Sequence, residues 1–149
     1  MLESQKKEKI LQLAADLDND LEKKDIDKLM SYFSEDCEIE MLGIRLKTHS
    51  GVKKWLEWFF SSFKSINFKP IVIMVENDTF FEEFFIQGIT TNNTELNIKV
   101  SEVLVYENYK IKSLRLYLDR LLFADAAITG FFGKKIVNLI KKKSLEGLL

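Results

Sequence analysis

Residues 80–119 read FFEEFFIQGITTNNTELNIKVSEVLVYENYKIKSLRLYLD. Three runs in this stretch, 80–90, 95–106 and 110–119, are rich in β-branched and aromatic residues and follow a two-residue period, which predicts strands. A fourth such run, 68–75, precedes them. The links between the runs are short and contain Asn, Asp, Glu and Thr, the residues of turns. Because short links join antiparallel neighbours, the stretch predicts an antiparallel meander.

Helical periodicity dominates the chain before the meander. An apolar stripe at three- and four-residue spacing predicts a first helix over residues 4–22. Asp25 is the expected N-cap of a short second helix, and Ser50 that of a third. Two short strands are expected between the second and third helices, at 37–41 and 44–47. Helices followed by a meander predict the α+β class, with three N-terminal helices covering one face of a strongly bent, mostly antiparallel sheet.

Composition excludes several kinds of protein. The length of 149 residues, with 46% hydrophobic and 30% charged residues, predicts one folded domain. One Cys excludes an intramolecular disulfide, and one His excludes a multi-histidine metal centre, so we expect no metal. A net charge of −1 provides no overall field for nucleic acid. The 12 Phe residues predict a large apolar core or an apolar cavity.

The C-terminal end is basic although the whole chain is nearly neutral. Residues 131–149 carry a charge of +4, which leaves −5 for residues 1–130. Their apolar residues follow helical spacing, so a basic amphipathic helix is expected, packed on its own domain or on a partner subunit. The alternative is a weak contact with an anionic membrane surface. That contact would use five lysines: Lys134, Lys135, Lys141, Lys142 and Lys143. No signal-peptide-like or membrane-spanning run occurs, so a cytoplasmic protein is expected.

Four stretches together resemble the nuclear transport factor two-like superfamily, which includes ketosteroid isomerase, limonene epoxide hydrolase and SnoaL-like polyketide cyclases. They are KDIDKLMSYFSEDC at 24–37, HSGVKKW at 49–55, EVLVY at 102–106 and LRLYLD at 114–119. The resemblance implies a cone-shaped SnoaL-like domain at residues 1–125, with residues 126–149 as a tail rather than an independent domain. It also implies a curved, mixed sheet around a mostly apolar pocket and a homodimer built on the outer sheet face.

The family's catalytic positions are only partly matched. The ketosteroid isomerase resemblance places the general base at Met41 and the phenol donor near Leu17, both apolar here, and the acid donor near Glu102. The epoxide hydrolase resemblance places catalytic positions near Glu83 and a last-strand carboxylate on Leu116. The acid/base residue implied by the SnoaL-like resemblance also falls on Leu116. Each of these chemistries therefore lacks at least one group, and none is expected in its usual form.

Strand alternation assigns side chains to the pocket when Met41 and Leu116 are taken as pointing inward. Glu83 and Glu102 are then carboxyls in an apolar cavity, where burial would raise their pKa values and suit acid/base catalysis. A one-residue register difference would instead place both on the surface. The other predicted pocket residues are Leu17, Cys37, Met41, Trp55, Phe59, Phe85, Gln87 and Leu116.

Two functions remain open at this point. The first is binding of a small apolar molecule, with isomerase, cyclase or hydrolase chemistry that needs no metal or nucleotide cofactor and uses Glu102 and Glu83 for proton transfer. The second is a non-catalytic binding or dimerisation module whose apolar pocket is closed. The loss of polar groups at Met41 and Leu116 favours the second.

Overall fold

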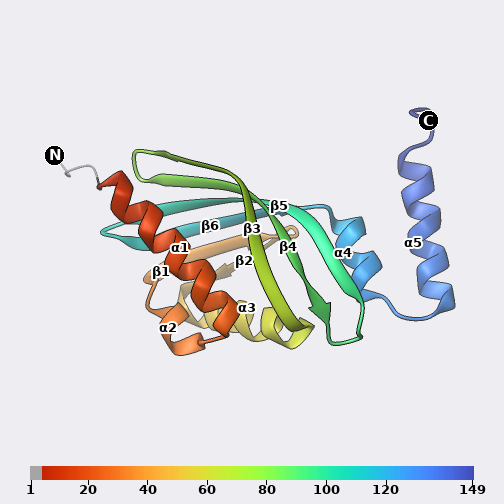
Figure 1. Cartoon of the computed structure of the whole chain (residues 1–149), viewed down its shortest axis with the longest axis horizontal. Coiled ribbons are helices and arrows are strands. Elements are labelled where there is room, and N and C mark those ends of the chain that lie inside the picture. The colour runs from red at the N-terminus through yellow and green to blue at the C-terminus, as the bar shows by residue number, and fades with distance from the viewer. Residues whose placement is uncertain (1–4) are drawn as a thin grey trace.

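A computed structural model describes residues 5–149 (Figure 1). Its helices are α1 (Lys7–Lys23), α2 (Ile26–Met30), α3 (Thr48–Ser62), α4 (Arg120–Ala127) and α5 (Phe131–Ser144). Its strands are β1 (Phe33–Met41), β2 (Ile44–Lys47), β3 (Phe63–Glu76), β4 (Thr79–Thr90), β5 (Glu95–Glu107) and β6 (Lys110–Leu118).

All six strands form one sheet in the order β2-β1-β6-β5-β4-β3. Every neighbouring pair is antiparallel except β1 and β6, which are parallel. The predicted meander is β3 to β6, and its turns place Asn77, Asn93 and Asn108 at positive φ, a conformation that Asn tolerates. The N-terminal helices pack against a curved sheet and a helical tail follows it, which confirms the predicted α+β class (Figure 1).

One of the two predicted helix caps is present, and a further cap starts α4. The Asp25 carboxylate accepts a hydrogen bond from the Lys28 amide at 3.1 Å, which starts α2 as expected. Asp119 caps α4 in the same way, as its place before an apolar run suggests. The predicted cap at Ser50 is wrong, because β2 runs directly into α3 and the helix begins at Thr48.

The interior lies between the helices and the concave face of the sheet. Strand β5 alternates strictly, so that every second side chain from Leu96 to Tyr106 is buried. Aromatic rings fill much of this interior as a connected series: Trp55 stacks on Phe59, Phe59 on Phe68, and Phe68 meets Phe84 edge-on. Four of the Phe and Trp residues noted in the sequence thus belong to one packed core.

The tail begins after α4. Gly130, at a φ of 99°, separates α4 from α5, and α5 extends away from the cone (Figure 1). Val137 is the buried residue of this helix. Within residues 5–149, none of the helices is long and apolar enough to cross a membrane.

Candidate acid/base site

Three carboxyl groups meet inside the cone, from Asp18 on α1, Glu82 on β4 and Glu102 on β5. One oxygen of each lies within 4.8 Å of the other two. Glu82 and Glu102 are 2% and 6% exposed, and Asp18 is partly buried. A group of acids this close in an apolar interior is costly, because charges are poorly solvated there and repel one another.

The strand register and helix packing create this cluster. Glu82 and Glu102 are direct partners across β4 and β5, flanked by the buried pair Phe80 and Leu104. On α1, Leu17 and Leu21 are buried against the sheet, and Asp18 lies beside them on the edge of the apolar stripe. The helix therefore carries a carboxyl to the sheet as a consequence of burying its neighbours.

Burial and mutual repulsion keep these acids protonated to unusually high pH. Burial, followed by the charges of Glu82 and Glu22, raises the pKa of Asp18 to about 8. Burial raises the pKa of Glu82 to about 7. Burial, with repulsion from Asp18 and Glu82, raises the pKa of Glu102 well above its ordinary value. The cluster thus holds groups that donate and groups that accept a proton near neutral pH.

Three buried polar atoms of the interior have no hydrogen-bond partner among the described residues. They are Glu82 Oε1, Tyr106 Oη and Trp55 Nε1. Burial and the Glu102 and Asp18 charges raise the pKa of Tyr106, so its phenol remains a hydrogen-bond donor. Unpaired buried polar atoms each cost about 1–3 kcal/mol of stability.

Asp20, two residues from Asp18, shows what a structural buried carboxylate looks like in this protein. It is 2% exposed, but it accepts a hydrogen bond from Tyr32 Oη at 2.6 Å and pairs with Lys28 at 2.9 Å. The Tyr32 bond, aided by Lys28, lowers the pKa of Asp20. Asp20 is therefore a satisfied anion, whereas the cluster of Asp18, Glu82 and Glu102 is not.

The alternation predicted for β4 is wrong by one residue. Glu83 lies on the outer face, 3.1 Å from Lys99 Nζ, and Phe85 lies beneath the same lysine. Gln87 is also on the outer face, where its amide is 3.4 Å from Asn97 Oδ1. Residues 80–85 read FFEEFF, so the two possible inward-facing sets of side chains have the same composition. Ile86 beside Gln87 is the one pair in β4 whose apolar member indicates the inward-facing set.

The other predicted positions lie on the inner side. Glu102 points inward as expected, and the predicted pocket residues that join it in the core are Leu17, Cys37, Met41, Trp55, Phe59 and Leu116. Asp18 and Glu82 were missed. Asp18 adjoins the predicted Leu17 on the edge of the stripe, so the helix pattern held a usable signal.

Two surface pockets reach the inner residues. One, of about 190 Å³ and mostly apolar, lies between the β1–β2 hairpin and α3 and is lined by Met41 and Trp55. The other, of about 240 Å³, is lined by Met41 and Leu116. The two positions where the family resemblance expects a base therefore line surface openings, while the acids lie deeper on β4 and β5.

The same three carboxyls would offer oxygen ligands to a hard divalent cation. Such an ion would first displace their protons, because all three have raised pKa values. Cation binding at this cluster would thus release protons and weaken at low pH.

The sequence model of the SnoaL-like domain matches residues 15–114, and the chain belongs to this family. The matched region contains Asp18, Glu82 and Glu102. A search of curated protein sequences finds no match.

Solved structures of the same fold are similar over most of the chain. A nuclear transport factor two-like protein of unknown function from Burkholderia pseudomallei has a TM-score of 0.75 at 11% identity, covering 81% of this chain and 98% of its own. The epoxide hydrolase/cyclase-like enzyme SalBIII, described in pyran ring formation in the polyether salinomycin, has a TM-score of 0.68 at 15% identity. The match covers 76% of this chain and 92% of SalBIII. A protein of ketosteroid isomerase-like fold from Catenulispora acidiphila, in complex with trimethylamine, has a TM-score of 0.69 at 11% identity. The match covers 77% of this chain and 91% of that protein. At these identities the similarity shows the fold alone.

Proposed function

We propose that the protein is a cofactor-free acid/base enzyme that moves a proton within a small, largely apolar carbonyl compound. The observation that carries this proposal is the close cluster of Asp18, Glu82 and Glu102, in which Glu82 Oε1 is buried and has no hydrogen-bond partner among the described residues. Apolar walls around it favour an apolar substrate, and the named relatives include an epoxide hydrolase/cyclase-like enzyme of the same fold. Isomerisation, cyclisation and hydrolysis all need such groups.

Each acid has a distinct role in this proposal. Glu82, with a pKa of about 7, is the base, and its free Oε1 removes a proton from the carbon beside the carbonyl. Glu102 stays protonated and donates a hydrogen bond to the oxygen that becomes negative. The proton held by Glu82 then returns to another carbon, which completes an isomerisation with no net gain or loss of atoms. Asp18, with a pKa of about 8, holds a further proton beside the pair.

The test compares two neighbouring residues that undergo the same chemical change. Glu82→Gln alters the cluster, whereas Glu83→Gln alters an outer-face residue paired with Lys99 and is the matched control. A set of small cyclic β,γ-unsaturated ketones is supplied, and conjugation is followed by ultraviolet absorbance. We expect Glu82→Gln to lower kcat/KM by about 10²-fold or more and Glu83→Gln to leave it unchanged.

Ligand binding provides a second measurement that does not need turnover. 2-Naphthol is an apolar phenol whose fluorescence distinguishes its neutral and anionic forms, and a buried acid donor stabilises the anion. Binding about tenfold weaker in Glu102→Gln than in wild type, with Glu83→Gln unaffected, supports the proposal. Equal loss in Glu82→Gln and Glu83→Gln, or turnover unchanged by Glu82→Gln, contradicts it.

A non-catalytic module is the second candidate, and the ring series from Trp55 to Phe84 favours it because these rings fill the cone. The two functions differ in whether a ligand enters. If neither 2-naphthol nor any ketone binds, while Phe59→Ala creates binding by opening the core, the closed module is the correct function.

We further propose a homodimer in the cytoplasm. The outer sheet face carries a row across three strands, Met74, Phe81 and Val103, in which Met74 is 57% exposed. Apolar rows on a sheet face favour association with a second copy. Cys37 is a free, buried thiol, which suits a reducing compartment.

A further inference from the structure

Helix α5 turns its apolar side away from the cone. Its outward residues are between 47% and 79% exposed: Phe131, Phe132, Ile136, Leu139 and Ile140. Leu148 and Leu149, beyond the helix, are more than three-quarters exposed. Amphipathic helices of folded domains normally bury this side, so its exposure here requires a partner.

The outward orientation is held by specific contacts on the opposite side of α5. Val137 is buried, and Lys134 and Lys141 each pair with Asp125 of α4 at 3.4 Å. Gly133 allows a close approach, since a Cβ there would lie 2.4 Å from Ile128 Cγ2. Turning the apolar side inward would break all of these contacts.

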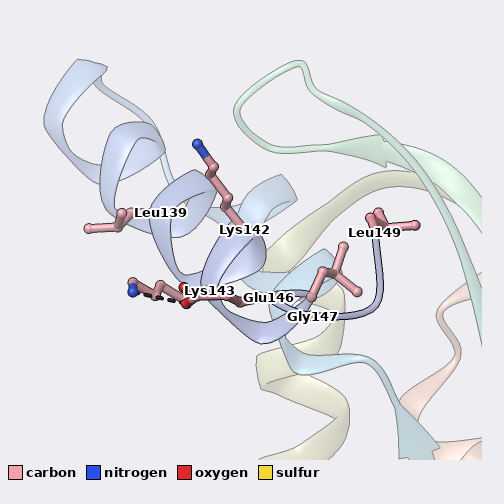
Figure 2. Close-up of a pocket in the computed structure, with 7 residues that line it drawn as sticks. Leu139, Lys142, Lys143, Glu146, Gly147 and Leu149 are labelled. Carbon is pink, nitrogen blue, oxygen red and sulfur yellow. Dashed lines mark hydrogen bonds and ion pairs between the residues drawn. The ribbon is translucent and has the colours of Figure 1, made fainter.

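Lysines border the exposed apolar side. Lys135 and Lys142 are two turns apart on one edge of the helix, and Lys135 Nζ lies 5.9 Å from the centre of the Phe131 ring. A groove of about 510 Å³ continues this surface past the helix end, lined by Leu139, Lys142 and Leu149 among others (Figure 2). Glu146 is the single acid of residues 131–149, and it pairs with Lys143 (Figure 2).

We propose that α5 is a docking surface for an anionic lipid bilayer, lying in the plane of the headgroups with Phe132, Ile136 and Leu139 inserted. Lysines at the edge of an inserted apolar side meet lipid phosphates and carboxylates. Phe and Leu on the apolar side are typical of helices that lie in the interface plane. A second copy of α5 fits less well, because two such helices would bring their lysines together with few acids to offset them.

Vesicle flotation of the full chain tests this proposal, with phosphatidylcholine vesicles that contain either about one-third phosphatidylserine or none. The wild-type protein should float with the anionic vesicles, sink with the neutral ones, and lose binding as salt is raised. The double variant Lys135→Gln/Lys142→Gln should bind about 25-fold more weakly, at about fivefold for each lysine. Lys9→Gln/Lys53→Gln, on exposed parts of the cone, makes the same change in charge and should bind like wild type.

The apolar contribution has its own pair of variants. Phe132→Ser should weaken binding to anionic vesicles at least tenfold, whereas Ile44→Ser, at an exposed apolar residue of β2, should not. Both sites are exposed, so circular dichroism should match wild type. The proposal is overturned if wild type floats with neither vesicle or equally with both, or if the α5 variants bind like wild type. It is also overturned if Phe132→Ser halves the mass measured by sedimentation, because the surface would then join two copies of the chain.

Discussion

The protonation of Glu102 follows from where this residue lies in the fold. It is 6% exposed and faces Glu82 across the sheet, so ionisation would leave a charge without solvent or a cation. Protonation removes that cost. The carboxyl therefore behaves as a neutral hydrogen-bond donor at pH values where ordinary glutamates are anions.

This protonation makes stability depend on pH. In the folded state burial raises the pKa of Glu82 to about 7 and that of Asp18 to about 8, and it raises the pKa of Glu102 well above its ordinary value. The folded state therefore holds protons that the unfolded state releases above its lower carboxyl pKa values. Stability is thus fully present below the unfolded pKa values and falls as pH rises through the folded ones. Glu102→Gln should raise the Tm by about 3–6 °C near pH 8 and flatten its decline with pH.

Thermal melts of wild type and Glu102→Gln across this range check the prediction. Glu83→Gln is the control, because it removes only a partly exposed pair with Lys99 and should shift the Tm little. Parallel pH profiles for wild type and Glu102→Gln would show that Glu102 ionises normally.

Strand β4 shows which information the sequence contained. Its existence and its neighbours followed from the two-residue period and the short turns, and β3 to β6 formed as predicted. The orientation of β4 did not follow, since the FFEEFF doublets give both faces the same composition. Within β4 the sequence offered Ile86 beside Gln87 as a single indication, and the pairing of Glu82 with Glu102 of β5 is a tertiary feature that the strand pattern alone does not give. The inward position of Asp18 likewise depends on how α1 packs against the sheet.

Helix α4 gives a prediction for one element. The Asp119 carboxylate accepts hydrogen bonds from the Leu121 and Leu122 amides at 2.8 and 3.4 Å. Asp119→Ala should cost about 1 kcal/mol of unfolding free energy, measured by urea denaturation. Because Phe123 of α4 contacts Trp58 of α3, hydrogen exchange should also increase in α4. Asp119→Asn, which keeps a cap, is the control, and a full 1 kcal/mol loss there would contradict a capping role.

At the scale of the whole molecule, the outer sheet face and α5 are separate apolar surfaces. The proposed dimer uses the first, where Val103 lies between Phe81 and Arg115. Val103→Arg places a second positive charge beside Arg115, and light scattering should show a change from dimer to monomer. Phe132→Ser on α5 should leave the dimer intact. A monomeric wild type, or a dimer unaffected by Val103→Arg, would contradict this interface.

The proposed acid/base function depends on the protonation of Asp18, Glu82 and Glu102 in one interior. Carbon-13 NMR of the Asp and Glu side-chain carboxyls, followed from acid to alkaline pH, measures it directly. We predict that Glu82 titrates at about pH 7, Asp18 at about pH 8 and Glu102 above its ordinary range, each assigned by its Gln or Asn variant. If all three titrate near 4, as exposed carboxyls do, the cluster is a solvated group of anions and the proposed acid/base function is wrong.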